Sequence, residues 1–92
     1  YHFTEAISLM VFCVTQAEID YYWEKLTADP DAEACGWLKD KYGVSWQIVP
    51  ANMNDLIVRG TDKQVAAVMK ELLEMKKIDI EHLERAWELA GE

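Results

Sequence analysis

Residues Cys35–Pro50 read CGWLKDKYGVSWQIVP. The two apolar ends of this stretch predict two strands, Ala34–Leu38 and Ser45–Val49, separated by polar residues that include Gly43. Glycine accepts the positive φ that a tight hairpin or its bulge requires. Because proline cannot donate to a strand ladder, Pro50 ends the second strand. We therefore expect a hairpin here.

Alternation divides the second strand of this hairpin into two faces of different chemistry. Trp46 and Ile48 point to one face, while Ser45, Gln47 and Val49 point to the other. The first face is suited to a hydrophobic core. The second face is small and partly polar, so we expect it to look towards something other than the core.

The segments before the hairpin predict a buried strand and an amphipathic helix. Residues Ala6–Val14 (AISLMVFCV) form an almost continuous apolar run, typical of a strand covered on both faces. A capping box of Thr15 and Glu18 then begins a helix over Gln16–Thr27. Alternation places Ala6, Ser8, Met10 and Phe12 on one strand face, and the helix has an apolar stripe of Ile19, Tyr22, Trp23 and Leu26.

The chain beyond Pro50 changes to a helical pattern. A short helical turn is expected around Asn54–Val58, and a second capping box of Thr61 and Gln64 begins a helix that runs to about Lys76. Asp79 caps a last helix. The stripe Val65, Val68, Met69, Leu72 and Met75, and the line Ile80, Leu83, Trp87 and Ala90, are interpreted as core packing.

Length and charge limit the classes of function. A chain of 92 residues is one domain by length, and 17 acidic against 9 basic residues give a net charge of -8. Such a surface disfavours nucleic acid and anionic membranes. No apolar run approaches a membrane span, and there is no signal-peptide pattern. Cys13 and Cys35 suit reduced, buried cysteines in a cytoplasmic protein rather than a disulfide framework or zinc motif.

The order strand–helix–strand–strand, with EIDYYWEKL, CGWLKDKYGVSWQIVP and MKKIDIEHLERA, resembles the PhnB-like branch of the vicinal-oxygen-chelate superfamily. That superfamily includes glyoxalase I, the bleomycin-resistance proteins and the extradiol dioxygenases. Its members pair two βαβββ modules whose curved sheets enclose one cavity. The resemblance covers about Thr4 to Trp87 and implies that this chain is similar to the second module.

The resemblance implies an α+β fold, with residues 1–50 as one βαβββ-type, glyoxalase-like module with an antiparallel-rich sheet. Residues 51–92 are then the C-terminal helical segment of the same domain. The concave face of the sheet would bind the ligand. Trp37 either lines this cavity or covers the helix. The candidate ligand-binding residues are Ser8, Met10, Phe12, Trp37, Ser45 and Gln47.

The same resemblance implies no metal, cofactor or catalytic residue in this half. Metal-binding relatives use a His near the start of the first strand and a Glu in the last strand. Counting from the turn Asp40–Gly43 places Gln47 at the Glu position and Ala6 at the His position. Neither supplies the anionic oxygen or imidazole nitrogen that a divalent metal prefers. His2 and His82 are interpreted as surface or capping residues.

Three hypotheses about function follow. The first is a binding protein for an unidentified small organic molecule, with a homodimer or a missing module completing the cavity. The second is a metal-dependent lyase, isomerase or dioxygenase whose ligands lie in a missing module. The third is a non-catalytic dimerising domain. Some PhnB-like proteins are named 3-demethylubiquinone 3-methyltransferase, but nothing in this chain resembles a glycine-rich loop for a methyl donor.

Overall fold

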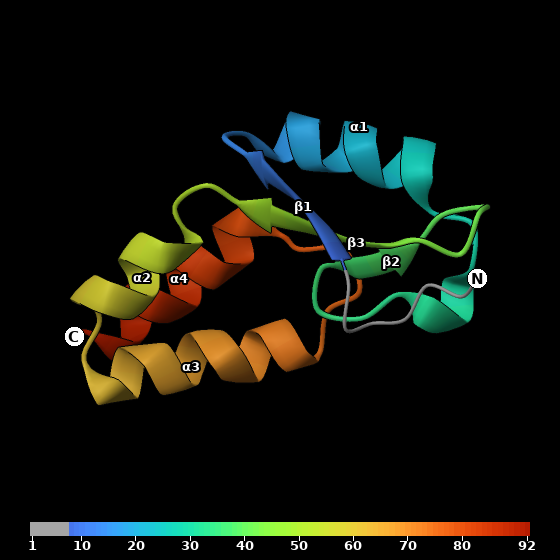
Figure 1. The fold of residues 1–92 in the computed structure, drawn as a ribbon. Helices are drawn as coiled ribbons and strands as arrows, with labels where there is room; N and C mark the ends of the chain where they lie inside the picture. The colour runs from blue at the N-terminus through green and yellow to red at the C-terminus, as the bar shows by residue number, and fades with distance from the viewer. Residues whose placement is uncertain (1–7) are drawn as a thin grey trace.

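The computed structural model describes residues 8–92, which form an α+β fold, as the sequence predicts. Ala6 and Ile7, the first residues of the expected strand, lie outside the described residues. Figure 1 shows the elements, which are β1 (Ser8–Cys13), α1 (Gln16–Leu26), the 3-10 turn η1 (Pro30–Ala32), β2 (Trp37–Lys39), β3 (Ser45–Pro50), α2 (Met53–Arg59), α3 (Asp62–Leu73) and α4 (Ile80–Ala90). Within this part of the chain, no helix has the length and apolar character to cross a membrane.

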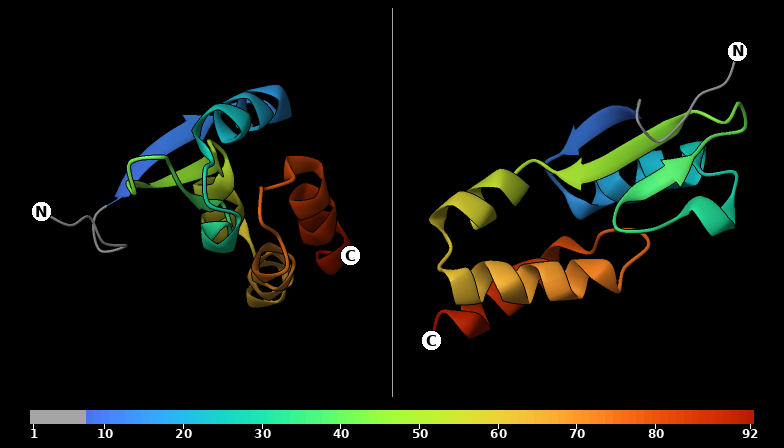
Figure 2. Two further views of the ribbon diagram at one scale, coloured as in Figure 1. Left: turned by 90° about the vertical axis from the view of Figure 1, so that its right-hand side faces the viewer. Right: turned by 60° about the horizontal axis from the view of Figure 1, so that its bottom comes forward.

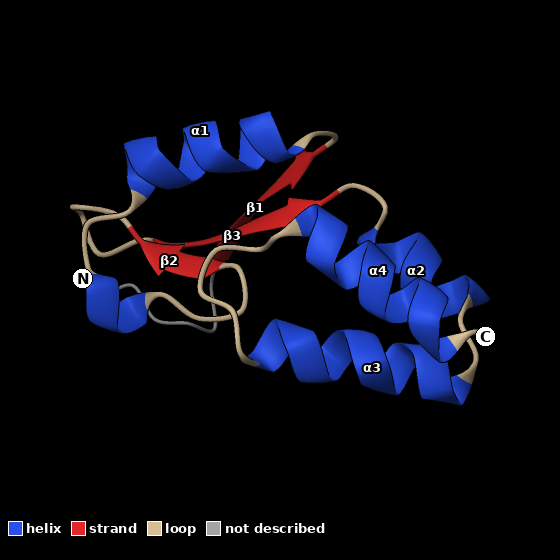
Figure 3. Ribbon diagram, turned by 180° about the vertical axis from the view of Figure 1, so that it is seen from behind, coloured by secondary structure: helices blue, strands red, loops and turns tan. Residues whose placement is uncertain are grey.

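The sheet has the strand order β1-β3-β2 within the described residues. Strand β1 runs parallel to β3 and β2 runs antiparallel to it, so the expected antiparallel-rich sheet is mixed. A strand followed by a helical crossover can return parallel, and α1 lies in the connection from β1. The register places Met10 and Trp37 on either side of Gln47. Figures 2 and 3 show α1 on one side of the sheet, with α2 and α3 beyond the carboxyl end of β3.

Helix α1 begins as expected at Thr15, whose hydroxyl accepts a hydrogen bond from the amide of Glu18 at 3.2 Å. The Glu18 carboxylate accepts from the amide of Val14, not that of Thr15, so the box is shifted by one residue. The stripe prediction is wrong for Tyr22, which is exposed and contacts the Tyr21 ring edge-on. The buried residues of α1 are Ile19 and Trp23, and Tyr22 lies beside this line on the solvent side.

The hairpin turn is organised by Asp40. Its carboxylate accepts hydrogen bonds from the amides of Tyr42 (2.8 Å) and Val44 (3.0 Å) and from the indole Nε1 of Trp46 (2.9 Å). Gly43 has a φ of 80°, as the turn requires. Desolvation raises the pKa of Asp40, but these hydrogen bonds outweigh it and hold the pKa below its ordinary value. The turn thus fixes the start of β3.

Two hydrophobic clusters stabilise the molecule. The first lies between the sheet and α1, and the second joins α3, α4 and the segment between them. The first contains Cys13, Ile19, Trp23, Leu38 and Ile48, and the second contains Val68, Ile78 and Leu83. The core assignment is wrong for Met69, which is exposed on α3. The predicted division of the domain at residue 50, into a glyoxalase-like module and a C-terminal helical segment, stays a prediction.

Hydrogen bonds join the helical part to the sheet. The Gln16 side chain donates to the carbonyl of Ile78 at 2.9 Å and accepts from the amide of Ile80 at 2.8 Å. The amides of Cys35 and Gly36 donate to the carbonyls of Met75 and Lys76, each at 2.8 Å. These bonds hold the segment between α3 and α4 against both α1 and the turn before β2.

The C-terminal helices keep their expected caps but change their lengths. Both halves of the Thr61 and Gln64 capping box form, and Asp79 caps α4. The turn expected around Asn54–Val58 is a complete helix, α2, and the indole of Trp87 donates to the carbonyl of Leu56 on this helix at 2.9 Å. Helix α3 ends at Leu73, not near Lys76.

Candidate functional site

A groove of about 600 Å³ lies between the free face of the sheet and helices α2 and α3. The sheet wall consists of Met10, Phe12, Trp37, Gln47 and Val49. The helix wall consists of Met53, Asn54, Ile57, Met69, Leu72 and Leu73. Most of these side chains are apolar. The groove is therefore suited to an apolar ligand with few polar groups.

Gln47 is the polar group on the sheet wall of the groove. Its amide Nε2 donates to the hydroxyl of Ser8 at 2.9 Å. Its oxygen Oε1 makes no hydrogen bond with residues 8–92 and can accept one from a ligand. Met10 and Trp37 are the partners of Gln47 on the two neighbouring strands. The wall thus presents one amide between a thioether and an indole.

The structure brings most of the predicted site residues together. Met10, Phe12, Trp37 and Gln47 line the groove, and Ser8 lies beside Gln47. Ser45 lies instead in a second, smaller hollow of about 410 Å³. Trp37 lines both hollows, so it faces the groove and not α1.

The helix wall of the groove was missed from the sequence. The sequence pattern assigns Met69 to the core, and it predicts only a short turn where α2, which contributes Met53 and Ile57, lies. The available signal was the methionines themselves, because flexible Met side chains line adaptable binding surfaces as well as cores. Met53 and Ile57 come from α2, which follows directly after β3, whereas Met69 and Leu73 come from α3, which is separated from β3 by the whole of α2.

The residues around the groove do not fit a divalent metal. Its described lining contains no His and no carboxylate, and the amide nitrogen of Gln47 is held by Ser8. No three His, Cys, Asp or Glu side chains gather into a metal-binding group anywhere in residues 8–92. Ala6, the other expected metal position, lies outside the described residues. The absence of a metal from the protein stays a prediction.

The two cysteines differ in their surroundings. Cys13 is buried in the first cluster, and burial followed by the nearby Glu18 charge raises the pKa of its thiol. Such a thiol is a poor nucleophile at neutral pH. Cys35 is only half-buried, which corrects the expectation that both are buried. It has a φ of 54° at the turn before β2 and lines the groove.

Comparison with protein families supplies the wider context. A family model described as 3-demethylubiquinone-9 3-methyltransferase matches residues 1–49. The chain belongs to this family. Because the family is of the glyoxalase, or vicinal-oxygen-chelate, type, the superfamily resemblance is confirmed. The match includes the sheet wall as far as Val49 but not α2 and α3. A search of curated proteins found no match.

Proposed function

We propose that this protein binds a small, mainly apolar organic molecule in the groove, without a metal in this half. The family supports a small-molecule-binding fold. The observation that carries the proposal is the groove of about 600 Å³, which lies within the usual range for ligand pockets. The indole of Trp37 stacks on the ligand, and the amide oxygen of Gln47 accepts one hydrogen bond from it. No reaction is assigned.

Methyl transfer, which the printed family name describes, is not part of the proposal. A bound methyl donor needs close backbone approach to a large polar cofactor, for which glycine is the usual residue. No glycine is among the described residues that line either hollow. These residues do not fit such a donor, so we derive no step through it. An enzyme completed by another module, as in the PhnB-like branch, is the second candidate.

A second copy of the chain is the partner that we propose for the open side of the groove. Strand β1 has a neighbour on one side within the described residues, and such an edge is prone to pair with another chain. Phe12 at this edge is 62% exposed and Leu9 is 50% exposed. A homodimer through this region covers both side chains. The free thiols of Cys13 and Cys35 support a cytoplasmic location.

Binding of N-phenyl-1-naphthylamine, an uncharged aromatic probe that fluoresces in apolar sites, tests the proposed function. We expect a saturable rise in fluorescence. Trp37→Ala should weaken binding about tenfold, because loss of the aromatic contact and its buried area amounts to about 1.4 kcal/mol. Tyr42→Ala, in the exposed hairpin turn, is the matched control and should bind as the wild type does. Equal binding by both variants would overturn the assignment of the groove.

A further inference from the structure

Ser45 carries a buried hydroxyl without a hydrogen-bond partner among the described residues. The residue is only 2% exposed and lines the smaller hollow, yet its hydroxyl makes no hydrogen bond within residues 8–92. No side-chain oxygen or nitrogen that is sealed from water lacks a partner in this part of the chain, so the Ser45 oxygen opens onto the hollow. A buried hydroxyl costs free energy unless something provides its hydrogen bond. Ser45 therefore indicates a ligand with a polar group at this place.

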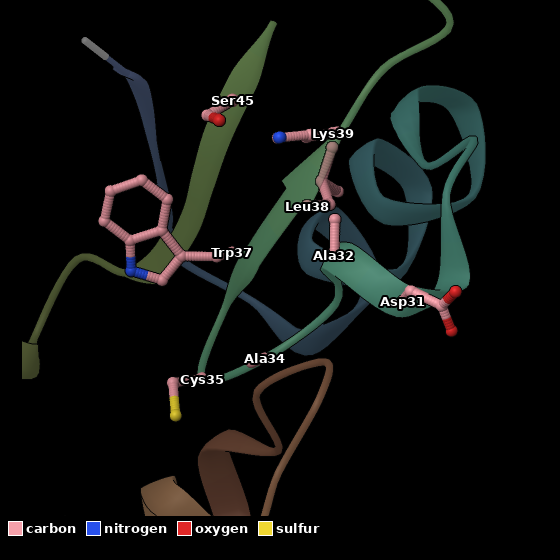
Figure 4. Close-up of a pocket in the computed structure, with 8 residues that line it drawn as sticks. All are labelled: Asp31, Ala32, Ala34, Cys35, Trp37, Leu38, Lys39 and Ser45. Atoms are coloured by element: carbon pink, nitrogen blue, oxygen red, sulfur yellow. The ribbon is translucent and has the colours of Figure 1, made fainter. Parts of the chain in front are cut away.

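The smaller hollow and the groove meet at Trp37. The indole lines both, and Figure 4 shows it on the same side of the sheet as the Ser45 hydroxyl. Trp37 is the partner of Gln47 across β2 and β3. Ser45 and Gln47 are two residues apart on β3, so their side chains leave the same face of the strand about 7 Å from each other. A flat ligand that packs against the indole can therefore reach both polar groups.

The described lining of the two hollows offers a ligand no charged partner. In the groove, the described residues include no Lys, Arg, His, Asp or Glu. In the smaller hollow, Lys39 already takes part in another interaction, and Asp31 is exposed and points away from Ser45 and Trp37 (Figure 4). A charged group that leaves water without a counter-charge pays a large desolvation cost. A hydroxyl and an amide oxygen instead suit uncharged donors and acceptors.

We propose that the ligand of this protein is an uncharged aromatic molecule with a polar oxygen group at each end of its ring system. One hydroxyl donates to the Oε1 atom of Gln47 in the groove, the second oxygen forms a hydrogen bond with Ser45 in the smaller hollow, and the rings lie on Trp37. This inference rests on the proposed function, because it requires that the groove binds the rings. It adds the charge of the ligand and the spacing of its polar groups, which the volume of the groove does not specify.

The test compares three probes at pH 7 by titration of the ¹⁵N-labelled protein. The probes are 2-naphthol, naphthalene-2,6-diol and the anion 6-hydroxy-2-naphthoate, which share the same rings and one hydroxyl. We expect the diol to bind about fivefold more tightly than 2-naphthol, because it adds one hydrogen bond between uncharged groups. The anion should bind more weakly than the diol. The indole signal of Trp37 should move with both alcohols, and the amide of Ser45 mainly with the diol.

A variant of the serine sharpens the test. Ser45→Ala should remove the preference for the diol and leave the affinity for 2-naphthol within about twofold. It should also be as stable as the wild type in urea, because no hydrogen bond within the chain is lost with the hydroxyl. Tyr42→Phe, which removes a hydroxyl from the exposed hairpin turn, is the matched control and should keep the preference for the diol.

The outcomes separate this inference from the proposed function. Equal affinities of the diol and 2-naphthol for the wild type would mean that water alone satisfies Ser45, and they would overturn the inference while leaving the proposed function intact. The same holds if the anion binds as tightly as the diol, or if Ser45→Ala lowers the stability of the fold. No movement of the Trp37 and Gln47 signals with any probe overturns both.

Discussion

The two faces of the sheet differ in burial although their residues alternate along the same strands. On the face towards α1, Ile48 and Leu38 are 0% and 1% exposed. On the groove face, their neighbours Gln47 and Trp37 are only half-buried, and Met10 is 49% exposed. The buried residues on the α1 face belong to the first cluster, so this face contributes most to the stability of the sheet and α1. The groove face is left free to contact a ligand or a partner.

Ile48→Ala should have the largest effect on stability. Ile48 is fully buried in the first cluster, and truncation of such an isoleucine typically costs about 2–5 kcal/mol. Urea denaturation of the variant and the wild type measures this loss. A cost below about 1 kcal/mol would mean that the α1 face does not hold the core, and the comparison of the two faces would fail.

Asp40→Asn should have an intermediate effect. Asn has one side-chain oxygen where the carboxylate has two, and no charge, so the bonds from Tyr42, Val44 and Trp46 weaken. We expect a loss of about 1–2 kcal/mol at pH 7. Asp55→Asn, on the exposed side of α2, is the matched control and should change stability by less than about 0.5 kcal/mol.

The same variant gives a pH signature. The pKa of Asp40 in the folded protein lies below its ordinary value of 3.8. Its contribution is therefore fully present above that ordinary value and is lost as the pH falls through the lowered pKa. Between pH 7 and pH 2, the stability of the wild type should fall more steeply than that of Asp40→Asn. Parallel curves would contradict the role of the carboxylate in the turn.

Local signals made most of the fold predictable. Thr15, Thr61 and Asp79 mark helix starts, and alternation along β3 separates Ile48 from Gln47 correctly. Strand pairing was harder to predict from the sequence, because the parallel register of β1 with β3 depends on how α1 packs and not on any short motif. The prediction that Tyr22 belongs to the buried stripe of α1 is wrong for a similar reason, because the width of such a stripe depends on the sheet that packs against the helix.

The site was predictable only on its sheet wall. Alternation and the family resemblance together predict Met10, Trp37 and Gln47, because the period of two along a strand determines which residues share a face. The helix wall depends on the angle between the helices and the sheet. Long-range bonds hold the helical part against the sheet, among them those of Gln16 to Ile78 and Ile80, which lie more than 60 residues away in sequence. No periodicity encodes such contacts.

Gln47→Ala should have a small effect on the fold, although Gln47 is adjacent to Ile48. The substitution removes one hydrogen bond to Ser8 at the edge of an open groove, where water can replace the amide. We expect a loss of less than about 1 kcal/mol. Denaturation beside Ile48→Ala measures the contrast. If Gln47→Ala were the more destabilising of the two, the facing of β3 would be inverted.

Phe12→Ser should have the smallest effect on the stability of a single chain. Phe12 is 62% exposed, so the folded chain loses little packing, and we expect a change of about 0.5 kcal/mol or less at concentrations where the chain is monomeric.

The effect of Phe12→Ser should fall on assembly instead. Burial of several hundred Å² of apolar surface at about 25 cal/mol per Å² drives association, and a serine at this edge removes part of that drive. Sedimentation at tens of micromolar should find a dimer for the wild type and a monomer for Phe12→Ser. Tyr42→Ser, which removes an even more exposed aromatic ring from the hairpin turn, should leave the dimer intact. A monomeric wild type would remove the second copy from the proposal and leave the groove open on that side, with its ligand held by the sheet and the helix wall alone.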